Sequence, residues 1–356
     1  MVAVEASGAR MLAEDYDALL LDLDGTVYRG GTPVAGAVPT LSRLRAMPVS
    51  VRYVTNNASN RPEQVAEKLN SMSIPATSSD VSTSAQAGAA LLAERLTAGD
   101  SVLVLGTEAL AEEVVSRGLR PVRSADETPV GVLQGHSEAT AWRDLAEACL
   151  AIRAGAVWVA CNRDTTLPTE RGELPGNGAL VAALEVATGR SPVVAGKPEK
   201  PLLSHAAVGT TKPLFVGDRL ETDTAGARGA DMCSMLVLTG VSGAADVLAA
   251  PPEARPDYLA ADLTALCAPV EESAITPQPE WKAEVTGDGM TLSAPEARHR
   301  REQASRQASP REDLAALRSL CAVWWSAAGG PVRVRSGDRR AQRALYRLGL
   351  DSGTDR

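Results

Sequence analysis

The chain of 356 residues carries a formal net charge of −8 and has a sequence pI near 5.2. This length is typical of about two or three domains. The acidic balance argues against a general role in nucleic-acid binding or at membrane surfaces. No apolar run approaches the length of a transmembrane helix, and the first residues lack the basic and apolar regions of an export signal. We therefore expect no nucleic-acid partner and no membrane insertion.

The side chains available for the core are mostly aliphatic. Hydrophobic residues make up 44% of the chain but aromatic residues only 3%, so Ala, Leu and Val must fill the cores. The five cysteines are scattered and form no C-x-x-C pair, so their spacing does not suggest a metal knuckle or a disulfide framework. Reduced thiols of this kind indicate a cytoplasmic protein.

The first predicted strand ends in two carboxylates. The apolar run 18–21 is typical of a buried parallel strand, and Asp22, Asp24, Gly25 and Thr26 follow it. Alternate residues of an extended segment share a face, so both carboxylates can enter one site. Two aspartates beside a glycine turn suit a hard cation and a phosphate. The alternative is an ordinary acidic turn.

Strands and helices then alternate as far as residue 189. We predict a helix over 38–45, a strand over 49–54 that ends in Thr55 and Asn56, and a helix from Pro62 capped by Asn60. Turn-forming residues over 161–178 predict a shaped loop. The remaining expected strands cover 101–105, 130–133 and 156–160, and the remaining helices cover 87–96, 110–117, 141–151 and 179–188.

Two further polar groups lie beside strands in the second half. Gly196-Lys197-Pro198 precedes a strand over 213–216, and that strand ends in Asp218, with Asp223 five residues further on. Another strand is expected over 234–238. The carboxyl ends of strands in a doubly wound sheet converge on one crevice, so we expect these groups to meet Asp22 and Thr55 there.

The composition changes after residue 267. Three prolines in 268–280 indicate a linker. Beyond it we predict a hairpin over 281–293, a helix opened by a capping box at Ser309, a strand over 331–335, and a last short helix that ends at Gly349. This tail is locally basic, with twelve arginines between Arg298 and Arg347.

The four polar groups together match the needs of phosphoryl transfer. A carboxylate can act as the nucleophile, and Mg²⁺ requires carboxylates beside phosphate oxygens. A hydroxyl, an amide and an ammonium can hold the remaining phosphate oxygens. A second acid is needed to protonate the leaving alkoxide and later to activate water.

These motifs, in this order, resemble the haloacid dehalogenase (HAD) superfamily over roughly residues 16–267. The segment between Thr55 and Lys197 is similar to the large α/β cap of the class-IIA group, which includes 4-nitrophenyl, phosphoglycolate and nucleotide phosphatases. The cap signature consists of Asn162-x-Asp164, Pro168, Gly172 and Pro175-Gly176-x-Gly178. The appended tail further resembles that of bacterial glycerol-3-phosphate phosphatases, which is described as acetyltransferase-like.

The resemblance implies a fold and a domain order. The fold is α/β: a doubly wound, Rossmann-like HAD core, a large inserted α/β cap and a small C-terminal α+β domain. The core comprises 1–83 and 191–267, the cap 84–190, the linker 268–280 and the acetyltransferase-like domain 281–356. The oligomeric state stays open, including a homo-oligomer.

The resemblance also implies roles in catalysis and metal binding. Asp22 corresponds to the nucleophile and a Mg²⁺ ligand, and Asp24 to the general acid and base, with its carbonyl on the metal. Asp218 corresponds to the third metal ligand. Asp223 corresponds to a supporting acid, although alone it also fits a helix N-terminal residue that complements the dipole.

The residues to which the resemblance assigns phosphate binding are Asp22, Gly25, Thr55, Asn56 and Lys197. In the family, the lysine that corresponds to Lys197 bridges the phosphate and the nucleophile. Without that resemblance, Lys197 would be interpreted as a solvated lysine in a loop.

The cap residues expected to contact the substrate are His136, Arg163 and Asp164. His136 reads equally well as a surface histidine. These loops offer charge but no aromatic ring for a base to stack on, which favours a small polar phosphomonoester.

The implied function is Mg²⁺-dependent hydrolysis of a small phosphomonoester, with glycerol 3-phosphate first, through an aspartyl-phosphate. The alternatives are 2-phosphoglycolate, another sugar phosphate or a nucleotide as substrate, or a metabolite sensor that acts through the C-terminal domain. Dehalogenase or phosphonatase chemistry is disfavoured by Asp24.

Overall fold

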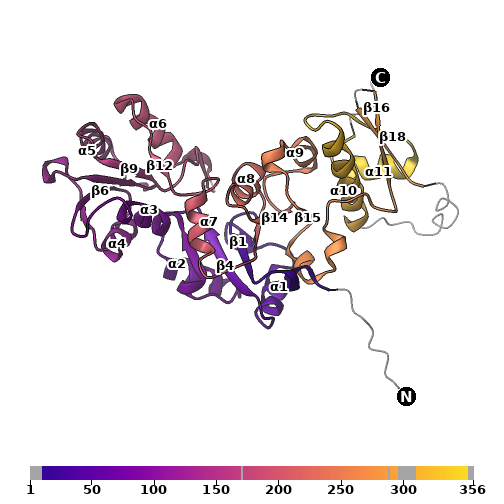
Figure 1. Cartoon of the computed structure of the whole chain (residues 1–356), viewed down its shortest axis with the longest axis horizontal. Helices are drawn as coiled ribbons and strands as arrows, with labels where there is room; N and C mark the ends of the chain where they lie inside the picture. The colour runs from indigo at the N-terminus through magenta and orange to yellow at the C-terminus, as the bar shows by residue number, and fades with distance from the viewer. Residues whose placement is uncertain (1–9, 170, 288, 296–309, 352–356) are drawn as a thin grey trace, which may run out of the picture. The chain divides into compact units, whose positions relative to one another are not determined.

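The computed structural model describes residues 10–169, 171–287, 289–295 and 310–351. The chain forms two compact units, one made of residues 1–51 and 210–356 and the other of residues 52–209 (Figure 1). Within the described residues, no helix combines the length and the apolar character that crossing a membrane requires.

A parallel sheet of strands forms the centre of the first unit. Four of its strands are hydrogen-bonded in the order β15-β14-β13-β1. The run Ala18–Leu21 is fully buried, as its continuous apolar character predicts for a strand covered on both faces. The bounds of the strands are β1 Ala18–Asp22, β13 Pro213–Gly217, β14 Cys233–Val237 and β15 Tyr258–Ala260. The next strand in the order, β4 (Ser50–Thr55), contains the boundary between the units.

Short elements connect these strands. A two-stranded hairpin follows β1, and a π-helical turn (Leu220–Thr224) follows β13. The bounds are β2 Tyr28–Arg29 and β3 Thr32–Pro33 for the hairpin, and α1 Ala37–Leu44, α8 Ala225–Gly229 and α9 Ala244–Ala249 for the helices.

The C-terminal residues fold against the rest of the first unit. Helix α10 (Pro310–Ala327) and helix α11 (Arg339–Arg347) pack on a three-stranded sheet of β16 (Lys282–Thr286), β17 (Gly289–Ser293) and β18 (Val334–Ser336). The hairpin and both helices confirm the elements expected there. The predicted cap at Ser309 lies outside the described residues.

One hydrophobic cluster joins this tail to the core. Leu248 and Leu259 of the core share it with Leu317 of α10. The guanidinium of Arg255 lies 5.3 Å from the ring centre of Trp325 and donates a hydrogen bond of 3.2 Å to the Trp325 carbonyl. The segment expected to be a linker also contacts α10, because the N–H of Gln278 donates a hydrogen bond of 2.9 Å to Ser319 Oγ. The tail is therefore packed on the core.

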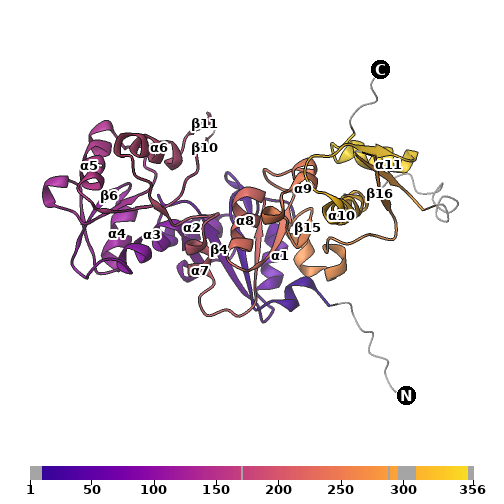
Figure 2. The ribbon, with the colours of Figure 1, turned by 45° about the horizontal axis from the view of Figure 1, so that its top comes forward.

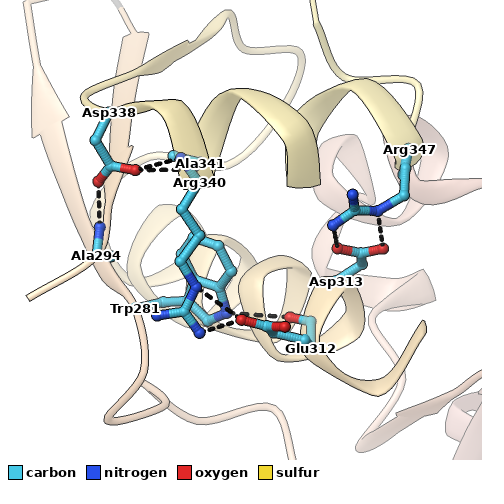
Figure 3. A network of polar contacts seen from close by, with 8 residues as sticks. All are labelled: Trp281, Ala294, Glu312, Asp313, Asp338, Arg340, Ala341 and Arg347. Carbon is cyan, nitrogen blue, oxygen red and sulfur yellow. Dashed lines mark hydrogen bonds and ion pairs between the residues drawn. The ribbon is translucent and has the colours of Figure 1, made fainter. Parts of the chain in front are cut away.

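A polar network holds the tail's own elements together (Figure 3). The Arg340 guanidinium lies 4.7 Å from the ring centre of Trp281 and pairs with the carboxylate of Glu312. The indole N–H of Trp281 donates to the Glu312 carbonyl at 3.0 Å. Arg347 makes two hydrogen bonds of 2.6 Å with Asp313. The two arginine–carboxylate pairs hold α11 against α10, and the Arg347 pair uses both oxygens of Asp313.

The second unit contains a five-stranded parallel sheet in the order β12-β9-β8-β6-β7. Helices α3 and α4 cover one face, and α5 and α6 lie on the other (Figures 1 and 2). The strands are β6 Ser101–Leu105, β7 Arg120–Val122, β8 Gly131–Gln134, β9 Val157–Ala160 and β12 Val193–Val194; the helices are α3 Ser84–Ala93, α4 Glu108–Ser116, α5 Trp142–Arg153 and α6 Asn177–Thr188.

The rest of the second unit contains the carboxyl end of β4. That end pairs in parallel with β5 (Val81–Thr83), and helices α2 (Pro62–Ser71) and α7 (Lys200–Ala206) pack nearby.

The structure differs from one local expectation for this unit and adds detail to another. The cap of α2 is Arg61 and not Asn60, because Pro62 is the first helical residue and the Gln64 side chain accepts the Arg61 N–H at 2.9 Å. The loop expected over 161–178 contains a hairpin, β10 (Thr166–Thr169) paired with β11 (Gly172–Pro175).

Candidate active site

Three aspartates gather at the carboxyl end of the first unit's sheet. Asp22 ends β1, Asp218 follows β13, and Asp223 lies in the π-helical turn. One oxygen from each lies within 4.8 Å of the others. Because β1 and β13 are parallel neighbours, with Leu21 opposite Val216, their ends necessarily meet at one edge. The structure thus brings together three of the aspartates singled out in the sequence.

The chain packs closely around Asp218, which is only 1% exposed. Its Oδ2 accepts the Val241 N–H at 2.7 Å. A Cβ added to Gly25 would lie 2.5 Å from the same oxygen, and one added to Gly240 would overlap it. Gly25 also has a φ of +88°, which favours glycine. These two glycines therefore make room for the carboxylate.

Asp223 supports the backbone of this site. Its Oδ2 accepts the N–H groups of both Asp218 and Arg219, each at 3.1 Å. The side chain also lies against Gly217, where a Cβ would overlap it. This geometry makes Asp223 the residue that fixes the chain direction after β13.

Asp24 is exposed and lies in the turn after β1. The turn is closed by the Gly25 N–H, which donates to the Tyr28 carbonyl at 2.8 Å. Burial raises the pKa of Tyr28, and the charges of Asp24 and Asp22 raise this pKa further. Tyr28 therefore stays a neutral phenol beside the carboxylates.

The carboxylate cluster fits a magnesium ion. Mg²⁺ prefers hard oxygen ligands and is usually bound through a few carboxylates together with water and substrate phosphate. Asp22, Asp218 and Asp223 supply carboxylates from two strand ends and one turn. The space kept open by Gly25 and Gly240 places the Asp218 carboxylate within this cluster.

A second set of predicted residues gathers within the second unit. Thr55 ends β4, and its Oγ1 accepts the Asn57 N–H at 3.1 Å. The next residue, Asn56, bonds through its side chain to both Lys197 and Asp164. Lys197 is only 3% exposed. Motifs that are far apart in sequence are thus held in direct contact.

The other two predicted cap residues have different surroundings. His136 is half-buried, and its carbonyl accepts the Ser59 hydroxyl at 2.8 Å. Arg163 is exposed and forms an ion pair with Glu185 of α6. Contact of either side chain with a substrate stays a prediction.

Sequence reasoning missed two kinds of residue at these sites. Gly240 and Val241 follow β14 and pack against Asp218, but a glycine after a strand is too common a signal to single them out. Asn162 was noticed as part of a pattern, and its contact with the Asn56 carbonyl had no sequence signal.

Comparison with known proteins agrees with this fold. Family models for haloacid dehalogenase-like hydrolases match residues 19–120 and 194–266, and a GCN5-related N-acetyltransferase-like model matches residues 278–350. D-glycerol 3-phosphate phosphatase of Mycobacterium tuberculosis is 46% identical over 348 residues, covering 96% of each chain. An acid sugar phosphatase of Staphylococcus saprophyticus is 38% identical, covering 64% of this chain and 89% of its own.

A crystal structure of glycerol phosphate phosphatase from Mycobacterium tuberculosis in complex with magnesium superposes with a TM-score of 0.89. It is 46% identical and covers 96% of this chain and 100% of its own. The chain belongs to the haloacid dehalogenase-like hydrolase family. Within that family it is a phosphatase.

Proposed function

We propose that the protein hydrolyses glycerol 3-phosphate with Mg²⁺ as cofactor and a phosphoaspartate as intermediate. The observation that carries the metal and the chemistry is the cluster of Asp22, Asp218 and Asp223. The substrate rests on the M. tuberculosis relative, whose name states that activity and which matches this chain over both the core and the tail.

In this mechanism Asp22 is the nucleophile. Its carboxylate forms a bond to phosphorus while the bond from phosphorus to the substrate alkoxide breaks, and Asp24 gives the alkoxide its proton. Asp24 then takes a proton from water as the water attacks the phosphoaspartate, which releases phosphate and restores Asp22. Bound Mg²⁺ neutralises charge on the phosphoryl oxygens, and Asp22, Asp218 and the Asp24 carbonyl would hold it.

The remaining core residues hold the phosphoryl group. We assign phosphate contacts to Gly25, Thr55, Lys197 and the backbone of Asn56. The ammonium of Lys197 offsets negative charge that the carboxylates and phosphate bring together.

The cap loops select the substrate in this proposal. His136, Arg163 and Asp164 provide polar groups and no aromatic surface, which supports a small polyol phosphate over a nucleotide. The acid sugar phosphatase relative supports a sugar phosphate as the alternative, and 2-phosphoglycolate is the other small candidate. We place the enzyme in the cytoplasm on the basis of its five unpaired cysteines.

A second candidate function is metabolite sensing through the tail. A cavity of about 630 Å³ lies where α10 faces the residues that follow β15, and charged groups of both signs line it, among them Arg311, Arg318, Glu271 and Glu280. Cavities of this size hold small ligands. A ligand there would act beside the core and not at the carboxylate cluster.

The test compares kcat/KM for glycerol 3-phosphate, 2-phosphoglycolate, a hexose phosphate and a nucleoside monophosphate. We expect glycerol 3-phosphate to be preferred, and His136→Ala and Arg163→Ala to lower that preference. A preference for the nucleotide, or an equal effect of both variants on all substrates, would reject the substrate assignment.

A further inference from the structure

The Asn56 side chain makes two hydrogen bonds to the backbone of a single residue. Its Oδ1 accepts the Lys197 N–H at 2.8 Å, and its Nδ2 donates to the Lys197 carbonyl at 3.1 Å. An amide that binds both backbone groups of one residue fixes the direction of that residue's side chain. Gly196 permits this approach, because a Cβ there would lie 2.6 Å from Asn56 Oδ1.

The same amide reaches the cap loop. Asn56 Nδ2 lies 3.3 and 3.4 Å from the two carboxylate oxygens of Asp164. A primary amide has two N–H donors, so one can serve the Lys197 carbonyl and the other Asp164. Both N–H donors of the Asn56 amide can thus bind protein partners, and its oxygen accepts one backbone N–H.

Two more asparagines continue this arrangement. Asn162 Nδ2 donates to the Asn56 carbonyl at 2.8 Å, and Asn177, the first residue of α6, donates to the Asn162 carbonyl at 2.8 Å. Asn162 and Asn177 are both buried, where an unmade hydrogen bond is costly. A continuous series of amides therefore links α6 to the end of β4.

We propose that Asn56 is a positioning residue that aims the Lys197 side chain and couples it to the Asp164 loop, and that its side chain is not a phosphate ligand. The inference rests on the proposed function, in which Lys197 holds the phosphoryl group. A change in the cap loop at Asp164 is thereby transmitted to the residue that supports the chemistry.

The test is a double-mutant cycle with Lys197. We expect Asn56→Ala to lower kcat on 4-nitrophenyl phosphate on the order of 10²-fold, the effect of misplacing a reacting group by about 1 Å. In a Lys197→Ala background the same substitution has nothing left to position, so it changes kcat less than about threefold. A loss of general packing would act equally in both backgrounds.

The chain provides a matched control. Asn70 makes the same two-bond contact with the backbone of Ala76, at 2.8 and 3.2 Å, away from Lys197 in the sequence. Asn70→Ala removes a similar contact and should leave kcat unchanged. Asn56→Asp is the second variant, because it keeps the shape but turns an oxygen toward the Lys197 carbonyl and the Asp164 carboxylate.

The outcomes separate this inference from the proposed function. If Lys197→Ala keeps wild-type activity, the proposed role of Lys197 fails. If Lys197→Ala is impaired and Asn56→Ala lowers kcat by the same factor in both backgrounds, Asn56 does not act through Lys197 and the inference is overturned. If Asn56→Ala lowers the thermal midpoint well below that of Asn70→Ala, the same cycle run with Asn56→Asp decides.

Discussion

Replacing Gly240 by alanine should weaken magnesium binding although no metal ligand is itself replaced. The added Cβ would overlap the Asp218 carboxylate. Overpacking of this kind typically costs about 1–3 kcal/mol of free energy, because side chains and backbone must shift to make room. The carboxylate is the first group that the Cβ meets, so we expect the strain to act on it. At about 1.4 kcal/mol per tenfold, the cost corresponds to a magnesium requirement about 5- to 150-fold higher.

The assay is phosphate release at a series of Mg²⁺ concentrations, with the thermal midpoint measured beside it. Gly31→Ala is the control, because its Cβ would meet no atom of the described residues within 4 Å and its φ is not positive. Gly240→Ala should recover much of its activity at saturating Mg²⁺. A folded Gly240→Ala variant with the wild-type Mg²⁺ requirement would refute the assignment of Asp218 as a ligand.

Two other predictions concern the metal and the tail. Chelation should abolish turnover, Mg²⁺ or Mn²⁺ should restore it, and Ca²⁺ should inhibit, because a larger ion relaxes the octahedral geometry; full activity after exhaustive chelation would contradict this. The composition change suggests that the tail can be removed without loss of the core, but the cluster shared by Leu248, Leu259 and Leu317 favours the opposite. A chain ending at residue 280 should melt more than about 5 °C below the full chain, and an unchanged midpoint would show an independent tail.

The strands of the sheet could be predicted because their apolar composition indicates that they are buried. The run that precedes Asp22 and the run that precedes Asp218 are apolar, and both are buried parallel strands. The carboxyl ends of such strands meet for topological reasons. The carboxylate cluster could therefore be predicted from the sequence, without any knowledge of distances.

The hairpin of β10 and β11, unlike the buried strands, could not be predicted from the sequence. Among the residues that the structure describes, its strands pair only with each other, and β11 is exposed along its length, so no buried alternation marks it. Pro168 and Pro175 also argue against strands in the sequence pattern, because proline in sheets is largely confined to edge strands. Turn-forming residues correctly indicated a surface feature but could not show that it was a hairpin.

The contacts of Asn56 could not be predicted for a different reason. Asp164 and Lys197 are 108 and 141 residues away from it. Side-chain hydrogen bonds over such separations depend on how loops from several strands pack. The sequence predicted that these motifs share a site. Which group each N–H of the Asn56 amide binds could be seen only in the folded structure.

The most direct test of the account is the turnover of a folded Asp22→Asn variant, with Asp24→Asn measured beside it. The covalent mechanism requires a carboxylate nucleophile at Asp22 and a separate acid at Asp24, so each variant should lose on the order of three decades in rate while keeping the wild-type thermal midpoint. Borohydride reduction during turnover should label Asp22 in the wild type, and the Asp22→Asn variant should take up no label at this position. Near-normal phosphate release by folded Asp22→Asn would contradict the central claim.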